Sequence, residues 1–356
     1  MFSYEHYVPI LKSKDAEFGA LTMLKAEAKE KVSPYFHVTE IPKPSKHKKE
    51  SKKPKKEITI EGYLRNIGRK ISNIRGHKAV FVDLNDVDGI SYGNVDQRII
   101  LEFFQNIKKG DINIIPACGI HLIRPYEKII EAVCKKINTG ICLRIEADDM
   151  EDVADVNDKI DRLLKLTDVP IDRCDLLVDM KELKKSHVRP IEEVLSMLNK
   201  MPYIGKSRTF ILASSSFPKI FDKGDSAADR NDIALWKEIK NQRKQLERMP
   251  TYGDYGIQNP DWKVSSEFVR SAVNLRYACD DYWLLYKGKL QKKGDGQFKG
   301  FCKKIMRRNE YGKVDFSWAD GHIKDCANGI EGPGNGATWR KIGFNRHMTI
   351  TVKQIA

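Results

Sequence analysis

The sequence predicts an α/β protein, a (β/α)8 barrel of the TIM type with an α/β extension at its C-terminus. Eight units, each a short apolar strand followed by a helical segment, occupy most of the 356 residues and match this barrel in count and length. The strands are continuous apolar runs such as AVFVDL at 79–84, which are typical of parallel strands buried on both faces. The alternative, an open doubly wound sheet, often has a glycine-rich first turn, whereas the first junction here is KSKDAEFG.

We expect each barrel strand where a short apolar run ends in polar residues. In chain order the expected strands are 7–12, 35–41, 79–84, 114–120, 140–146, 174–179, 208–214 and 251–257. Helices are expected where apolar residues recur every three or four positions, as at Phe18, Leu21, Leu24 and Ala28. The expected helices are 16–31, 63–74, 95–108, 125–137, 152–165, 190–200 and 232–248.

The pattern changes in the last hundred residues. Residues 265–278 are expected to form a helix, which could be the eighth of the barrel. Residues 281–287 and 347–355 have the composition of strands. The glycine-rich segment 329–336 is expected to be a loop.

We therefore expect a barrel over residues 1–278, with a lysine-rich insertion at 43–57, and an extension at 279–356 packed on the barrel. The formal net charge of +14 is concentrated in two segments of the chain. Residues 43–56 hold eight Lys and one Glu, and residues 287–313 hold ten Lys or Arg with two carboxylates. The rest of the chain is therefore close to neutral.

Both basic segments are candidates for nucleic-acid binding, because Lys and Arg contact phosphates without reading the base sequence. The first has almost no apolar residues, so it is expected to be a mobile loop, and the alternative is a loop that only adds solubility. The second has apolar residues at helical spacing, which predicts an amphipathic helix with a basic outer face. The candidate residues are Lys48, Lys49, Lys52, Lys53, Lys55, Lys56, Lys303, Lys304, Arg307 and Arg308.

Cysteine content and hydropathy indicate the compartment. The seven cysteines form no C-x-x-C motif and lie in apolar stretches, which predicts buried, reduced thiols. No window approaches 18 apolar residues, and charge appears too early for a signal peptide. We expect a cytoplasmic protein that does not enter a membrane.

A barrel of this type carries its reactive groups where the strands end, at one face. We expect catalytic carboxylates among Glu40, Asp83, Asp179 and Asp254. The ligand-binding candidates at the same face are Lys12, Arg144, Glu146, Ser214, Ser215, Ser216, Tyr255 and Arg276. Carboxylates from different strands could hold Mg²⁺ or Mn²⁺, although the spacing assigns no metal ligand. The alternative is an internal salt-bridge network that closes the top of the barrel.

Short motifs spread along almost the whole chain resemble the phage beta-protein family, named after the beta protein of T-even phages. They are YVPILK (7–12), TEIP (39–42), VDL (82–84), CLRI (142–145), LVD (177–179), SSSFP (214–218), GDYGI (253–257), NLRY (274–277), GHI (321–323) and WR (339–340). The resemblance implies a setting in phage biology or anti-phage conflict and adds His347 to the ligand-binding candidates. Two features depart from the family: the lysine-rich insertion, and Arg346 where a second histidine is expected beside His347.

Three functions stay open at this point. The first is an enzyme, a metal-dependent phosphodiesterase or nuclease-type hydrolase, indicated by polar strand ends and basic segments. The second is a non-catalytic barrel that binds a nucleotide-like ligand. The third is a subunit of a phage or defence assembly that contacts a protein partner.

Deletion of residues 43–56 tests the first basic segment. We expect weaker binding of DNA or RNA at low salt, because eight positive charges are removed, with a nearly unchanged melting temperature. Fluorescence anisotropy over a salt series and a thermal melt measure the two effects. A large drop in melting temperature would show that the segment is structural.

Overall fold

The structure, a computed structural model, describes residues 2–41, 58–74, 76–87, 89–90, 94–183, 189–261, 272–290 and 296–356. The lysines expected to bind nucleic acid between positions 48 and 56 lie outside these residues.

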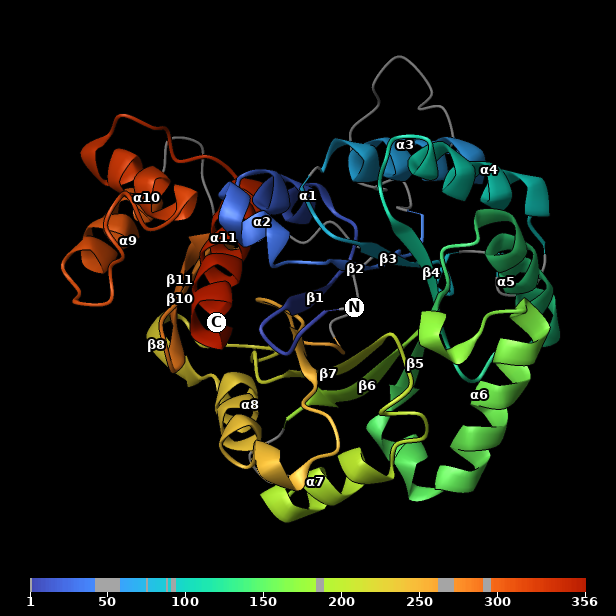
Figure 1. The fold of residues 1–356 in the computed structure, drawn as a ribbon. Coiled ribbons are helices and arrows are strands. Elements are labelled where there is room, and N and C mark those ends of the chain that lie inside the picture. Colours follow the sequence, from blue (N-terminus) through green and yellow to red (C-terminus); the bar gives the residue numbers. More distant parts are fainter. Residues whose placement is uncertain are drawn as a thin grey trace.

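Eight parallel strands close into a barrel, which confirms the predicted fold (Figure 1). The strands are β1 (Tyr7–Leu11), β2 (Tyr35–His37), β3 (Val80–Asp83), β4 (Ile114–Gly119), β5 (Ile141–Glu146), β6 (Cys174–Glu182), β7 (Thr209–Ser215) and β9 (Thr251–Asp254). Each strand pairs with the next barrel strand along the chain, and β9 closes the ring against β1. The strands therefore all end at one rim, which we call the mouth.

Amphipathic helices cover the outside of the barrel. They are α1 (Asp15–Thr22), α2 (Ala26–Glu30), α3 (Ile60–Asn73), α4 (Gln97–Lys108), α5 (Arg124–Ile137), α6 (Val153–Thr167), α7 (Ile191–Lys200) and α8 (Asn231–Asn241). In α5, for example, Ile130, Val133 and Ile137 are buried along one side, as the helical period requires. The single helix expected at 16–31 is wrong: the chain turns after α1, and Leu24 packs into the core at the turn.

The extension is built on a three-stranded antiparallel sheet in the order β10-β11-β8, formed by β8 (Gly224–Asp229), β10 (Ala272–Ala278) and β11 (Tyr282–Leu290). The strand at 281–287 is thus confirmed, and β8 reaches this sheet from the segment between β7 and α8. The helix expected at 265–278 is wrong where it is described, because 272–278 form β10. Val273, Leu275 and Tyr277 alternate with less buried residues, and this is the period of a strand.

Three helices complete the extension: α9 (Gln297–Met306), α10 (Trp318–Asn328) and α11 (Gly336–Ile355). The strand expected at 347–355 is wrong, because these residues end α11. Their β-branched residues suggest a strand, but burial of Ile350, Thr351 and Val352 in a packed helix outweighs that preference. Helix α11 lies between α8 and α1, where the eighth helix of a barrel belongs (Figure 1).

Two layers of apolar side chains fill the barrel, one inside the ring and one between the ring and its helices. Val8, Tyr35, Phe81 and Leu177 belong to the inner layer. A third cluster joins the extension sheet to α9 and α10. All seven cysteines are buried and unpaired, as predicted. No described helix has both the length and the apolar character needed to cross a membrane.

Candidate ligand site at the mouth of the barrel

The inner face of the mouth carries a compact polar network around Asp179. Strand residues alternate between the two faces of the ring, so Arg144, Asp179 and Tyr255 point inward with the inner apolar layer below them. Arg144 donates to Asp179 Oδ2 from Nε at 2.9 Å and from a terminal nitrogen at 2.5 Å. The Tyr255 hydroxyl donates to the same oxygen at 2.5 Å and accepts from Arg144 at 2.8 Å. Asp179 is fully buried, so this pairing neutralises a charge that water cannot reach.

A second network adjoins it at the ends of β2 and β3. The Tyr35 hydroxyl donates to Asp83 Oδ2 at 2.9 Å, and the Tyr35 ring lies 6.0 Å from the Arg144 guanidinium. His37 shares the inward face with Tyr35, and its Nε2 lies 2.7 Å from an oxygen of Asp86. Burial lowers the pKa of His37, but the two carboxylates outweigh this and raise it to about 9.

Four cations gather beside these networks, and we call them the cation cluster: Lys12, Lys14, Arg276 and Arg340. They come from the end of β1, the start of α1, β10 and α11. Burial lowers the pKa of each cation, and repulsion from Arg340 lowers it further for the other three. For Lys14 the pKa falls to about 8.

Carboxylates oppose the cation cluster only in part. Glu17 attracts Lys12, Lys14 and Arg340. Burial raises the pKa of Glu17 itself, although the amide N–H of Lys14 and the side chain of Gln258 both donate to it. Asp86 and Asp261 also attract Lys12.

Arg276 is the most unusual member of the cation cluster. Its guanidinium lies 5.5 Å from the ring of Phe217 and 5.7 Å from that of Phe221. Its Nε is enclosed and has no acceptor among the described residues. An enclosed N–H group without an acceptor is costly, and an anion or a water molecule at this position would satisfy it.

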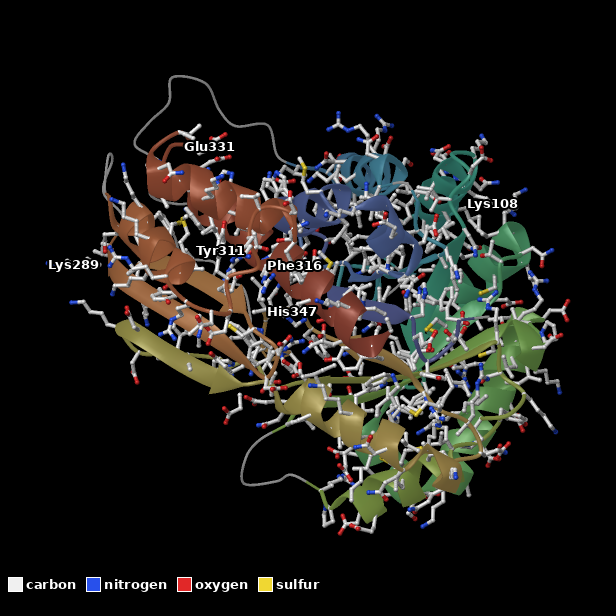
Figure 2. All side chains as sticks on the ribbon, turned by 60° about the vertical axis from the view of Figure 1, so that its left-hand side comes forward. Lys108, Lys289, Tyr311, Phe316, Glu331 and His347 are labelled. Atoms are coloured by element: carbon white, nitrogen blue, oxygen red, sulfur yellow. The ribbon has the colours of Figure 1, made fainter. Side chains whose placement is uncertain are left out.

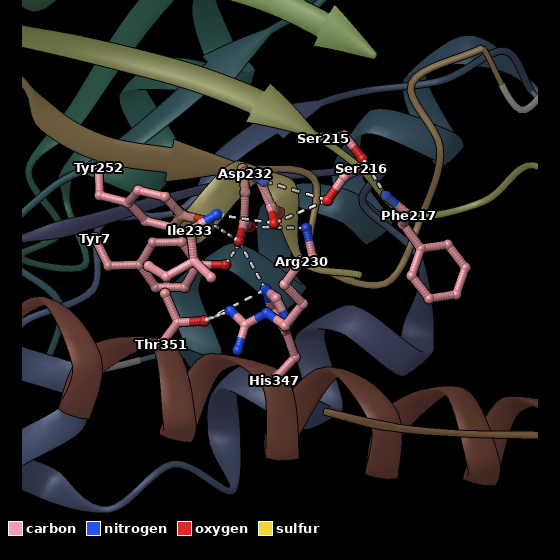
Figure 3. Close-up of polar contacts among 12 residues, drawn as sticks. Tyr7, Ser215, Ser216, Phe217, Arg230, Asp232, Ile233, Tyr252, His347 and Thr351 are labelled. Carbon is pink, nitrogen blue, oxygen red and sulfur yellow. Dashed lines mark hydrogen bonds and ion pairs between the residues drawn. The ribbon is translucent and has the colours of Figure 1, made fainter. Parts of the chain in front are cut away.

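Asp254 and His347 belong to a different network, on the outer face of the ring, and Figure 3 shows His347 with Tyr7 and Tyr252 of this network. Asp254 shares its face with Tyr252, whereas Tyr255 points inward. His347 Nε2 lies 2.7 Å from Asp254, whose carboxylate also accepts from the hydroxyls of Tyr7 and Tyr252. Burial raises the pKa of Asp254, but His347 and these hydrogen bonds outweigh it and lower the value. The expectation that Asp254 shares one cavity with Asp83 and Asp179 is therefore wrong.

The remaining candidates are spread around the rim. Ser214 is buried opposite Asp254 in the register of β7 and β9, and Ser215 donates to the carbonyl of Gln258. Ser216 donates to Asp232, which lies in the network of Figure 3. Glu146 is exposed and paired with Lys181 at 2.6 Å, and Glu40 is exposed. The structure thus brings together at the mouth Lys12, Asp83, Arg144, Asp179, Tyr255 and Arg276.

The basic residues of the extension form an exposed face on α9 and just beyond it. Lys303, Lys304, Arg307 and Arg308 are exposed, while Cys302 and Ile305 pack inward, so the predicted amphipathic helix is confirmed. Lys304 is paired with Asp225 at 2.7 Å. Figure 2 shows Lys289 extending outward from the end of β11 in the same part of the molecule.

Metal-binding groups and cavities are two further kinds of candidate site among the described residues. Within the ranges that the structure describes, no three His, Cys, Asp or Glu side chains are grouped so as to hold a metal ion. A cavity of about 470 Å³ lies between the α1–α2 turn and α10, lined by Trp318 and His322 among others. None of its lining residues belongs to the mouth.

Sequence reasoning missed four residues of this site: Lys14, Glu17, His37 and Arg340. His37 could have been found, because it lies two positions after Tyr35 on the same strand and must face the same side. Arg340 carried no such signal, since its place depends on how α11 packs against the barrel.

Comparison with known protein families gives a match over almost the whole chain. The family model described as "Beta protein" matches residues 7–353, nearly the whole chain. A search of curated proteins finds no match.

Replacement of Asp179 by Asn tests whether the inner network stabilises the fold. We expect the free energy of unfolding to fall by about 3–5 kcal/mol, because the amide leaves the partly buried Arg144 without a counter-charge. Urea denaturation measures the change. Asp155→Asn is the control, since Asp155 and Lys159 form an exposed pair whose removal costs less than about 1 kcal/mol. Equal, small effects in both variants would contradict the expectation.

Proposed function

The chain belongs to the Beta protein family of phage and mobile-element proteins, and from this premise we propose that its barrel mouth binds a phosphate-containing ligand during phage–host conflict. The site lies where barrels of this type bind their ligands, at the carboxyl ends of the strands. The two halves of the proposal, ligand and biological role, rest on different grounds. The ligand class follows from the charges at the mouth, and the role follows from the family.

One observation carries the ligand class: the enclosed Nε–H of Arg276, which has no acceptor among the described residues. A guanidinium presents its N–H groups in a planar fork that matches the oxygens of a phosphate. Phe217 and Phe221 lie beside this fork and restrict its orientation. The guanidinium of Arg276 is therefore preorganised for binding an anion.

The neighbouring cations support the same ligand. Burial, and then repulsion from Arg340, lower the pKa values of Lys12, Lys14 and Arg276, so each of these cations lies within electrostatic range of Arg340. A bound phosphate would relieve the repulsion for all of them at once. The fold therefore stores unfavourable electrostatic energy that binding of an anion releases.

The contacts at the mouth support binding more strongly than hydrolysis. Both oxygens of Asp83 accept hydrogen bonds, from Tyr35 and from the amide of Asn85. Asp179 Oδ2 already accepts hydrogen bonds from Arg144 and Tyr255. A catalytic role for these carboxylates stays a prediction, and so does a role as a non-catalytic subunit of a phage or defence assembly.

Replacement of Arg276 by Gln tests the ligand site. We expect the affinity for inorganic phosphate or pyrophosphate to fall roughly ten- to a hundred-fold, because a hydrogen bond to a charged group contributes about 1.5–3 kcal/mol. The melting temperature without ligand should stay equal or rise, since an uncompensated buried charge is removed. Isothermal titration calorimetry and a thermal melt give the two values.

Arg65→Gln provides the matched control, because Arg65 is exposed on α3 and pairs with Glu61 on the same helix. This variant should bind phosphate like the wild-type protein. Wild-type affinity in Arg276→Gln would contradict the proposed site. A failure of the wild-type protein to bind either anion would contradict the ligand class itself.

A second candidate function, nucleic-acid binding, is favoured by the basic face of α9. We expect Lys303→Gln, Lys304→Gln, Arg307→Gln and Arg308→Gln together to weaken DNA or RNA binding. The slope of log K against log salt should become shallower by about 0.7–0.9 for each phosphate that the variant no longer neutralises. Lys128→Gln with Lys136→Gln, two exposed lysines of α5, is the control. An unchanged slope in the α9 variant would exclude this face from binding.

A further inference from the structure

We propose that His37 is a direct ligand-binding residue of the mouth, whose Nδ1–H donates to an oxygen of the bound phosphate and makes binding dependent on a proton. This inference rests on the proposed function and adds to it a residue and a form of regulation.

The position of His37 qualifies it for contact with a ligand. It is the last residue of β2, in register with Asp83 at the end of β3. Tyr35, two positions earlier, belongs to the inner layer of the barrel, so His37 also faces inward, one step nearer the mouth. Its side chain is 19% exposed.

Hydrogen bonding fixes the imidazole ring and leaves one nitrogen open. Nε2 lies 2.7 Å from a carboxylate oxygen of Asp86, which only accepts, so Nε2 carries a hydrogen. Nδ1 is buried and has no hydrogen-bond partner among the described residues, although the protonated ring forms an ion pair with Asp83. The nearest oxygen of Asp83 is 3.7 Å from Nδ1, beyond hydrogen-bond distance, and it already accepts from Tyr35. A ligand oxygen therefore has an unused donor at this place.

The surrounding charges keep that donor protonated. The groups that face His37 are Asp83 and Tyr35 within the ring and Asp86 after β3, and Asp86 in turn interacts with Lys12 and Arg144. Burial disfavours the imidazolium, but the two carboxylates outweigh it and raise the pKa to about 9. The raised pKa means that the charge is present at neutral pH and is lost as pH rises through about 9. Phosphate affinity should follow the same curve.

Lys14 loses its charge in an overlapping range, because its pKa is about 8, so affinity against pH does not isolate His37. Nitrogen-15 NMR of the histidine side chains does isolate it. On addition of inorganic phosphate we expect the Nδ1 resonance of His37 to shift and its pKa to rise. His77 is the internal control, because it lies just before β3, at the opposite end of the barrel from the mouth, and its Nδ1 lies 2.8 Å from the carbonyl oxygen of Val32.

Two substitutions separate ligand contact from ring placement. Glutamine can keep a donor near the Nε2 position toward Asp86 but offers none at Nδ1, whereas asparagine can offer a donor near Nδ1. We expect His37→Gln to weaken phosphate binding at least tenfold, and His37→Asn to recover part of the affinity. His77→Asn, at the opposite end of the barrel, should bind phosphate like the wild-type protein.

The outcomes distinguish the inference from the proposed function. Wild-type affinity in His37→Gln, with weakened binding in Arg276→Gln, would overturn the role of His37 and leave the anion site standing. No phosphate binding by the wild-type protein would overturn both. If the His37 variants fail to fold, as judged by circular dichroism, the wild-type NMR titration decides: an unmoved Nδ1 resonance overturns the inference.

Discussion

The buried contact between Asp254 and His347 holds the C-terminal helix against the barrel, and the rest of the architecture depends on it. Asp254 ends the last barrel strand, and His347 lies in the middle of α11, so the pair joins the two elements that close the ring (Figure 3). Neither side chain is exposed. The hydroxyls of Tyr7 and Tyr252 donate further hydrogen bonds to the Asp254 carboxylate. A charge so enclosed leaves α11 only one place to dock.

Consecutive residues of α11 then connect the barrel to the extension. Asn345 donates to the carbonyl of Ala20 and accepts from the amide of Ala319, while the buried Arg346 is paired with Asp320 at 3.1 Å. One helix thus closes the ring, holds the extension and carries Arg340 to the mouth. The cation cluster forms because α11 packs against both the barrel and the extension, and so places Arg340 near cations of both.

The mouth contains two kinds of charge that differ in their compensation. Arg144 and Asp179 neutralise each other, so their contribution is to the stability of the ring. The cation cluster and His37 retain N–H donors without acceptors at Arg276 Nε and His37 Nδ1 within the described residues. An enclosed donor without an acceptor calls for a partner, such as a water molecule or a ligand. This contrast favours the second group as the ligand site and the first as its support.

The barrel could be predicted from the sequence alone, because eight apolar runs alternating with helical segments leave few other ways to bury them. The sequence also predicted that Asp83, Arg144 and Asp179 lie at the mouth, because each lies near a strand end, but it did not decide which face of the ring they take. The opposite position of Asp254 depends on which residue of 251–257 is the last to pair, and a shift of one residue moves a side chain to the other face. The identity of α11 as the eighth helix, and the meeting of Arg276 and Arg340 with Lys12, were decided by tertiary packing. These residues are far apart in the chain. The hydrophobic periodicity of each segment predicts its own secondary structure, but it does not predict which distant segments pack against one another.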